Sequence, residues 1–116
     1  MGNPVVHFEI TGADSGALQT FYGSLFGWKI ETMEGMDYGM VEKEEGGIGG
    51  GIAAAQGGPG HVTFYVAVDD PQAYLDKAAS LGGKTIMPVT VIPDMVTFAL
   101  FADPEGHVVG VVKNQV

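Results

Sequence analysis

The sequence has no cysteine and no arginine, and all five of its basic residues are lysines. Without cysteine, disulfide bonds and thiolate chemistry are excluded. Without arginine, the chain has no bidentate guanidinium clamp for a phosphate or a carboxylate. No apolar run approaches the ~20 residues of a membrane helix. The N-terminus also lacks a basic segment followed by an apolar one, so we expect no secretory signal and a cytoplasmic protein.

Positive charge is scarce, since fourteen acidic residues stand against five basic ones and the net charge is −9. Lysine and arginine provide most contacts to phosphates, so this balance argues against nucleic acids and anionic membranes as partners. An acidic surface attracts cationic ligands, although it also keeps a small protein in solution. The composition therefore leaves a small molecule as the expected ligand.

The chain repeats one pattern of residues, first over 7–30 and again over 61–85. Each copy opens on a histidine, continues as a strand and an acidic turn, and then gives a helix closed by glycine. With 116 residues, 46% of them hydrophobic, the chain has the size of one compact domain. We expect a single domain over 1–116, built from module one at about 4–56 and module two at about 60–114.

The first module begins with a half-buried strand at 5–10. Its side chains alternate, so Phe8 and Ile10 point to one face while His7 and Glu9 point to the other. Three further strands of this module are expected over residues 28–33, 38–44 and 46–58.

A helix follows the first strand, with Asp14 or Ser15 as its N-cap and Gly27 at its end. Its apolar side chains recur at i, i+3 and i+4, which is typical of a helix that packs on a sheet. The residues of this stripe are Leu18, Phe21, Tyr22, Leu25 and Phe26.

Residues 46–58, GGIGGGIAAAQGG, hold seven glycines. Glycine weakens a strand, so the run indicates close approach of another backbone or of a ligand, or a bulged strand. Its isoleucines and alanines argue against a flexible linker. We interpret it as the strand that closes module one.

Module two repeats the alternation over 61–68. His61, Thr63 and Tyr65 share one face, and apolar residues occupy the face expected to lie toward the helix.

The helix of module two is expected to start at Asp70, with Pro71 at its first position, and to end at Gly82. Three more strands are predicted over residues 84–92, 95–102 and 107–113.

Each half thus reads strand, helix, strand, strand, strand, which predicts an α+β fold made of two βαβββ modules. The sheet faces turned away from the helices carry polar side chains and are expected to form a pocket. Several aromatic residues and one methionine are candidates to stack on a flat ligand there, with a plain core position as the alternative. The expected ligand-binding residues are His7, Glu9, Trp28, Tyr38, Met40, His61, Thr63, Tyr65 and Phe98.

The strings HFEI…FYGSLFGWKI, HVTFYVAVDD, SLGGKT and FADPEGHVVGVV closely resemble the vicinal oxygen chelate superfamily. This superfamily includes glyoxalase I, extradiol dioxygenases, methylmalonyl-CoA epimerase, and fosfomycin and bleomycin resistance proteins. The resemblance covers almost the whole chain. It implies paired βαβββ modules whose mixed sheets curve into a cup, in a homodimer with two such pockets.

The resemblance also implies a divalent metal (Zn, Ni, Fe or Mn) held by side chains of the first and last strands of each module. His7 and His61 match the two histidine positions. At the position where the family pattern has a glutamate, however, this sequence has Gly110. The strand at 47–55 has no carboxylate, imidazole or amide side chain. Catalytic metal sites usually have three protein ligands, and the two histidines supply only two. Glu9 is the candidate for the third ligand. A site without a metal is an equal alternative.

Two functions remain open at this point. The first is a glyoxalase-like lyase or isomerase, in which His7 and His61 hold a metal and Glu9 acts as the general base. The second is a metal-free protein that sequesters a ligand, as the bleomycin-resistance members do, for which the acidic composition favours a cationic molecule. The missing carboxylates favour the second, and the pair of histidines favours the first. Near the C-terminus, His107 is expected to cap a turn.

Overall fold

The computed structural model describes residues 2–32, 35 and 37–114. Contacts divide the chain into two compact units, His7–Thr63 and a second made of Met1–Val6 with Phe64–Val116. Each unit combines one helix with part of the strands, so the predicted α+β class is confirmed. Neither described helix is long and apolar enough to span a bilayer.

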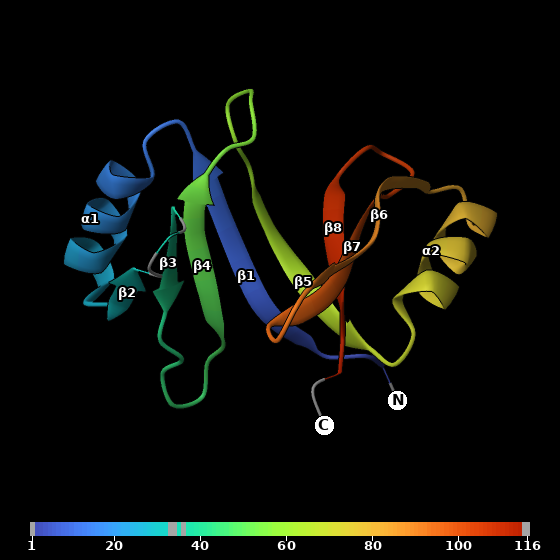
Figure 1. Cartoon of the computed structure of the whole chain (residues 1–116), viewed down its shortest axis with the longest axis horizontal. Coiled ribbons are helices and arrows are strands. Elements are labelled where there is room, and N and C mark those ends of the chain that lie inside the picture. Colours follow the sequence, from blue (N-terminus) through green and yellow to red (C-terminus); the bar gives the residue numbers. More distant parts are fainter. Residues whose placement is uncertain (1, 33–34, 36, 115–116) are drawn as a thin grey trace. The chain divides into compact units, whose positions relative to one another are not determined.

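The first unit follows the order strand, helix, and three strands. Its sheet runs β2-β3-β4-β1, with β1 and β4 parallel and the other pairs antiparallel (Figure 1). The end of β1 that lies before His7 belongs to the second unit. The elements are β1 (Val5–Gly12), α1 (Ser15–Phe26), β2 (Ile30–Thr32), β3 (Tyr38–Val41) and β4 (Gly49–Ala54).

The second unit repeats this topology. Its sheet runs β5-β8-β7-β6. The strands β5 and β8, which come first and last in the sequence of this unit, are again adjacent and parallel, and the other pairs are antiparallel. The predicted duplication of a βαβββ unit is therefore confirmed by strand order as well as by sequence pattern. The elements are β5 (Val62–Val68), α2 (Pro71–Ser80), β6 (Lys84–Ile92), β7 (Val96–Ala102) and β8 (Val108–Lys113).

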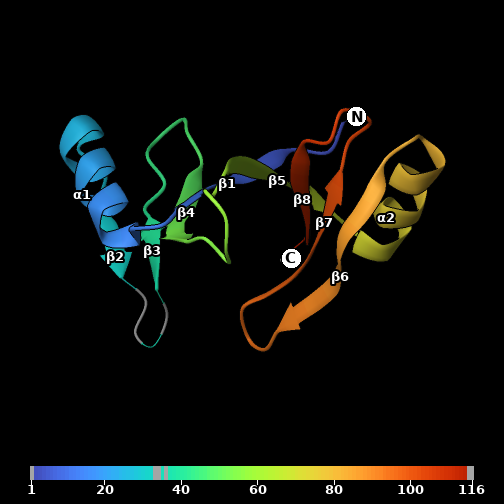
Figure 2. The same cartoon turned by 90° about the horizontal axis from the view of Figure 1, so that it is seen from above.

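Strand boundaries follow the prediction to within one residue in the second unit and less closely in the first. Strands β2 and β3 are shorter than the predicted 28–33 and 38–44, and Met33 lies outside the described residues. Figure 2, seen from above, shows α1 beside β2 and β3, and α2 beside β6.

Both helices begin where their capping residues predict. The Asp14 carboxylate accepts a hydrogen bond from the backbone N–H of Ala17 at 3.0 Å. Asp70 accepts from the N–H groups two and three residues on, at 3.1 and 3.3 Å. These bonds satisfy N–H groups that have no partner inside the helix. Gly27 ends α1 in the left-handed conformation, with φ 70°.

Each unit has its own apolar core between the helix and the sheet. Leu75 of α2, only 2% exposed, packs with Val68 of β5 and with residues of β7 and β8. In the first unit, Ile10, Val41 and Ile52 are buried, and Phe8 with Trp28 packs against them.

The apolar stripe of α1 is only partly buried. Leu18 and Tyr22 pack against the core. Phe21, Leu25 and Phe26 are 58%, 57% and 58% exposed. Because α1 lies mainly against β3 and β4, and β2 is only three residues long, the flank of the helix has little sheet beneath it.

Burial along β5 also differs from the prediction that its apolar face is the covered one. Val62 is 72% exposed and Phe64 is 41% exposed, whereas Thr63 and Tyr65 are 6% and 7% exposed. The helix-side core begins only further along the strand, at Val66. The start of β5 therefore projects beyond the part that α2 covers.

Candidate functional site

The polar face of the first unit brings together three predicted site residues. The Tyr38 hydroxyl lies 2.9 Å from Nε2 of His7 and 3.4 Å from Oε2 of Glu9. His7 and Glu9 are two residues apart on β1, so they share a face. Tyr38 belongs to β3, from which it reaches across β4 to β1. We call these three residues the His7–Tyr38–Glu9 triad.

Gly51 of β4 makes this reach possible. It pairs with Glu9 on β1 and with Met40 on β3, so it lies between the strands that the triad joins. A Cβ atom at Gly51 would overlap the Tyr38 hydroxyl. Only glycine therefore leaves room for the tyrosine side chain to cross the strand.

The neighbouring glycine has a similar role on the opposite face. A Cβ atom at Gly50 would overlap the ring of Phe8, which packs on the core of the first unit. The sequence predicts that the glycine-rich strand admits another backbone or a ligand, or that it is bulged. In the structure, two of its glycines make room for aromatic rings of the same unit.

The electrostatics of the triad favour neutral side chains on His7 and Tyr38. Burial lowers the pKa of His7 below its usual value. The pKa of Tyr38 is raised well above its usual value, first by burial and then by the negative charge and hydrogen bond of Glu9. A neutral imidazole, a protonated phenol and a carboxylate can thus form one chain of hydrogen bonds, in which Tyr38 donates to Glu9.

A cavity of about 580 Å³ adjoins the triad at His7. This volume falls within the range of roughly 300–1,000 Å³ that is common for small-molecule sites. Met40, which is 39% exposed, gives the cavity an adaptable apolar wall. The charged or imidazole side chains along it are His7, Lys29, Glu31, Glu42 and Lys43.

His61 lies outside this cavity. Its backbone N–H donates to Oγ1 of Thr11 at 3.0 Å, and its carbonyl accepts from the N–H of Thr11 at 2.8 Å. Thr11 is four residues from His7 along β1, a distance of roughly 13 Å at the usual rise of a strand. The two histidines therefore lie at different levels of the sheet, and the side chain of His61 is exposed.

Trp28 belongs to the core rather than to the polar face. Its ring centroid lies 5.3 Å from that of Phe8, 5.7 Å from that of Tyr22 and 5.1 Å from that of Phe26. Phe8 and His7 are adjacent on β1, so their side chains point to opposite faces of the sheet.

Tyr65 and Phe98 pack together in the second unit, with ring centroids 6.3 Å apart in an edge-to-face arrangement. The Tyr65 ring occupies the space that a Cβ atom at Gly110 would need. Gly110 is the position at which the resemblance predicts a glutamate. Thr63 is buried.

The side chains described do not fit a three-ligand metal site. Within residues 2–32, 35 and 37–114, no three His, Asp or Glu side chains come close enough to hold one ion. A carboxylate at Gly110 would also overlap Tyr65. In the first unit, the imidazole of His7 and the carboxylate of Glu9 are instead joined through the Tyr38 hydroxyl.

The turn before β8 is capped by Asp103 rather than by His107, for which the sequence predicts that role. Oδ1 of Asp103 accepts hydrogen bonds from the N–H groups of Glu105 and His107 at 2.9 and 3.0 Å. The His107 ring lies 3.0 Å from Oδ2 of the same carboxylate. These bonds lower the pKa of Asp103.

Comparison with known sequences places most of the chain in one family. The model of the glyoxalase-like domain matches residues 7–112. "Putative glyoxylase CFP32" of Mycobacterium bovis and the protein of the same name in Mycobacterium tuberculosis are each 34% identical over 97 residues. These residues make up 80% of this chain but only 37% of each relative, so the chain spans well under half of their length.

Solved structures share the fold at low sequence identity. A hypothetical protein from Bacillus halodurans C-125 has a TM-score of 0.71 and 14% identity, covering 100% of this chain and 97% of that one. A glyoxalase/bleomycin resistance protein/dioxygenase superfamily member from Vibrio splendidus 12B01 has a TM-score of 0.66 and 15% identity, covering 97% and 100%. Methylmalonyl-CoA epimerase from Mycobacterium tuberculosis has a TM-score of 0.67 and 14% identity, covering 97% and 88%. The chain therefore belongs to the glyoxalase-like domain family, within the vicinal oxygen chelate superfamily.

Proposed function

We propose that this protein binds a small organic molecule on the polar face of its first unit, through the His7–Tyr38–Glu9 triad and without a divalent ion. The observation that carries the proposal is the Tyr38 hydroxyl, which bridges an imidazole and a carboxylate beside a cavity of about 580 Å³. Of the three residues, His7 lines the cavity, and polar groups at a cavity wall orient a ligand.

The charges at the cavity suggest what kind of ligand it takes. Lys29 and Lys43 offset Glu31 and Glu42, while Glu9 adds one negative charge beside the cavity. With the net charge of −9, this balance favours a ligand that carries a cationic group and a hydrogen-bonding group.

A melting experiment tests the proposal. The protein is dialysed against EDTA, and its melting temperature is measured with a panel of cationic and aromatic small molecules. A ligand that binds only the folded chain raises the melting temperature. We expect a shift with at least one compound, a smaller shift in Tyr38→Phe, and an undiminished one in Tyr22→Phe, the matched control. No shift across the panel would contradict the proposal.

A second candidate function is proton transfer, as in a lyase or isomerase with Glu9 as the base. The position of Glu9 favours it, since its carboxylate lies beside a hydroxyl and an imidazole. Glu9 would take a proton from a carbon next to a carbonyl group, and the electron pair would move to the carbonyl oxygen. We expect the wild type, but not Glu9→Gln, to speed deuterium exchange into hydroxyacetone in D₂O. An unchanged exchange rate would leave ligand binding as the function.

Metal content gives an independent test. We expect untagged protein to hold less than about 0.2 equivalents of transition metal, and Zn²⁺, Ni²⁺, Fe²⁺ or Mn²⁺ to leave its melting temperature unchanged, because an ion bound only by the folded state would raise it. One equivalent of metal lost in His7→Gln would contradict this expectation.

We also propose that the chain forms a homodimer, as the resemblance implies. The exposed side chains of Phe21, Leu25 and Phe26 on α1 support an interaction surface. Light scattering that returns the mass of one chain at micromolar concentration would contradict the proposal.

A further inference from the structure

The second unit has a cavity of its own, which the function proposed above does not use. It lies between α2 and the sheet and has a volume of about 350 Å³. We propose that this cavity binds a small aliphatic carboxylate, with the hydrocarbon chain inside and the carboxylate at Lys77. The proposal concerns residues other than the triad, so the two can fail separately.

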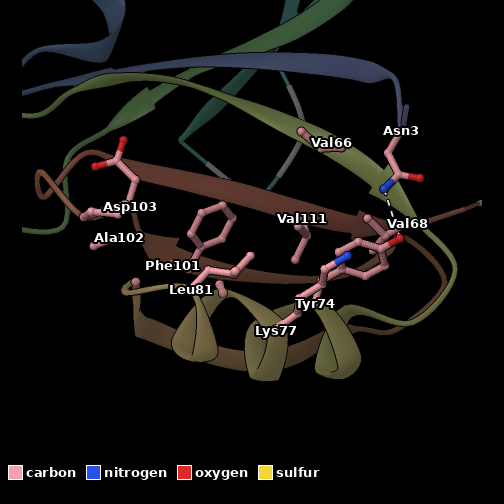
Figure 3. A pocket seen from close by; sticks show the side chains of 13 residues that line it. Asn3, Val66, Val68, Tyr74, Lys77, Leu81, Phe101, Ala102, Asp103 and Val111 are labelled. Atoms are coloured by element: carbon pink, nitrogen blue, oxygen red, sulfur yellow. Dashed lines mark hydrogen bonds between the residues drawn. The ribbon is translucent and has the colours of Figure 1, made fainter. Parts of the chain in front are cut away.

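The walls of the cavity come from one face of α2 and from the sheet beneath it. Tyr74, Lys77, Ala78 and Leu81 recur at the i, i+3, i+4 and i+7 spacing, which places them on one side of the helix. In Figure 3, Tyr74, Lys77 and Leu81 lie on the side of the helix, and the Phe101 ring and Val111 lie above them on the side of the strands. Most of this lining is apolar, as a hydrocarbon chain requires.

Small residues explain why the space is not filled by the protein. Ala78 on the helix and Ala102 on β7 both line the cavity, as does Gly83, which follows the helix. Leu81, at the edge, is 70% exposed and does not close the gap. Well-packed interiors leave few voids larger than a water molecule, so an apolar space of this size is suited to a ligand.

Polar groups gather at one end of the cavity. Nδ2 of Asn3 donates a hydrogen bond to the Tyr74 hydroxyl at 3.0 Å, which leaves the phenolic proton free to donate in turn. Lys77 is one turn of helix from Tyr74, and no carboxylate pairs with it within the described part of the chain. An ammonium and a phenolic donor together complement a carboxylate.

The opposite end of the cavity fixes the orientation of the ligand. Figure 3 places Asp103 there, far from Asn3 and Tyr74. The Asp103 carboxylate already accepts hydrogen bonds from its own turn and would repel a second carboxylate. We therefore expect the hydrocarbon tail to point toward Leu81 and Phe101.

The experiment is a titration of the ¹⁵N-labelled full chain with butanoate, hexanoate, octanoate and octan-1-ol, followed by amide chemical shifts. Each methylene buried should raise the affinity by up to about fourfold until the cavity is full. We expect octanoate to shift the amides of Val66, Ala78 and Val111, and to leave those of His7 and Tyr38 unchanged.

Paired variants separate the cavity from general binding to the surface. Ala78→Leu places a larger side chain inside the cavity and should weaken octanoate binding, whereas Ala79→Leu, an exposed neighbour outside the cavity, should not. Lys77→Gln should weaken octanoate by up to about fivefold, as expected for an exposed ion pair, and leave octan-1-ol unchanged. If Ala78→Leu fails to fold, the comparison of octanoate with octan-1-ol in Lys77→Gln still tests the proposal.

The proposal is overturned by any of three results. These are no shifts with millimolar octanoate, shifts confined to residues outside the cavity, or the same octanoate affinity in Ala78→Leu as in Ala79→Leu. If Lys77→Gln weakened the binding of octanoate and of octan-1-ol equally, Lys77 would not bind the carboxylate, which would contradict that part of the proposal.

Discussion

At the scale of single residues, the function of the glycines in β4 is to leave space. Gly51 lies where Tyr38 crosses toward Glu9, and Gly50 lies beneath Phe8. A triad that joins β1 to β3 across an intervening strand depends on that space. In the second unit, Gly110 likewise leaves space for the ring of Tyr65, its partner on the adjacent strand.

The first prediction concerns Gly51. Gly51→Ala forces the Tyr38 side chain to move and should lower the free energy of unfolding by about 1–3 kcal/mol, as overpacking usually does. Urea denaturation measures the change. In a Tyr38→Ala background, the same substitution should lose most of this effect.

Gly47→Ala is the matched control for this prediction, because a Cβ atom at Gly47 meets nothing closer than the carbonyl oxygen of Glu44 at 3.6 Å. Equal destabilisation by the two alanines would contradict the role assigned to Gly51.

The second prediction concerns pH. Burial lowers the pKa of His7 in the folded chain below the ordinary 6.5. Below about pH 6.5 the unfolded state therefore binds more protons than the folded state, and the stability contributed by neutral His7 is lost as the pH falls. We expect the free energy of unfolding of wild type to drop more between pH 7.5 and 5 than that of His7→Gln.

His107→Gln controls for the loss of an imidazole, since His107 is exposed at a turn. If His7→Gln and wild type changed by the same amount over this pH range, burial of a neutral His7 would be refuted.

The sequence predicted all three residues of the triad, but not the hydrogen bonds that join them. His7 and Glu9 are identified by strand alternation, and Tyr38 is identified only as a residue that could stack on a ligand. The bond from Tyr38 to Glu9 depends on a side chain that crosses a strand over a particular glycine. Periodicity within one strand carries no information about such a crossing.

At the scale of elements, local signals set where the helices begin. Asp14 and Asp70 each cap a helix through a side-chain oxygen, as their positions predict. Burial of a helix face, in contrast, depends on the breadth of the sheet beneath it. The narrow sheet of the first unit therefore covers only part of the apolar face of α1.

The third prediction concerns the cap of α2. Asp70→Ala removes the acceptor for two backbone N–H groups and should lower the free energy of unfolding by about 1 kcal/mol. Chemical denaturation measures it. Asp69→Ala, the preceding exposed residue, should have little effect, and a larger loss from Asp69→Ala would contradict the assignment.

At the scale of the whole molecule, the duplication was visible in the sequence because both halves repeat the same signals in the same order. The cavity under α2 was not, since it arises from small residues on separate elements that meet only in the fold. Family membership is shown for residues 7–112, but the curated relatives are much longer than this chain.

We propose that ligand binding depends on the His7–Tyr38–Glu9 triad rather than on a metal. Isothermal titration calorimetry tests it most directly, with the panel compound that gives the largest melting shift and EDTA-dialysed protein. We expect binding without added ions, weakened about three- to tenfold in Tyr38→Phe by the loss of one hydrogen bond, and unchanged in Tyr22→Phe. Binding that appears only after a divalent ion is added, or that is equally tight in Tyr38→Phe, would contradict it.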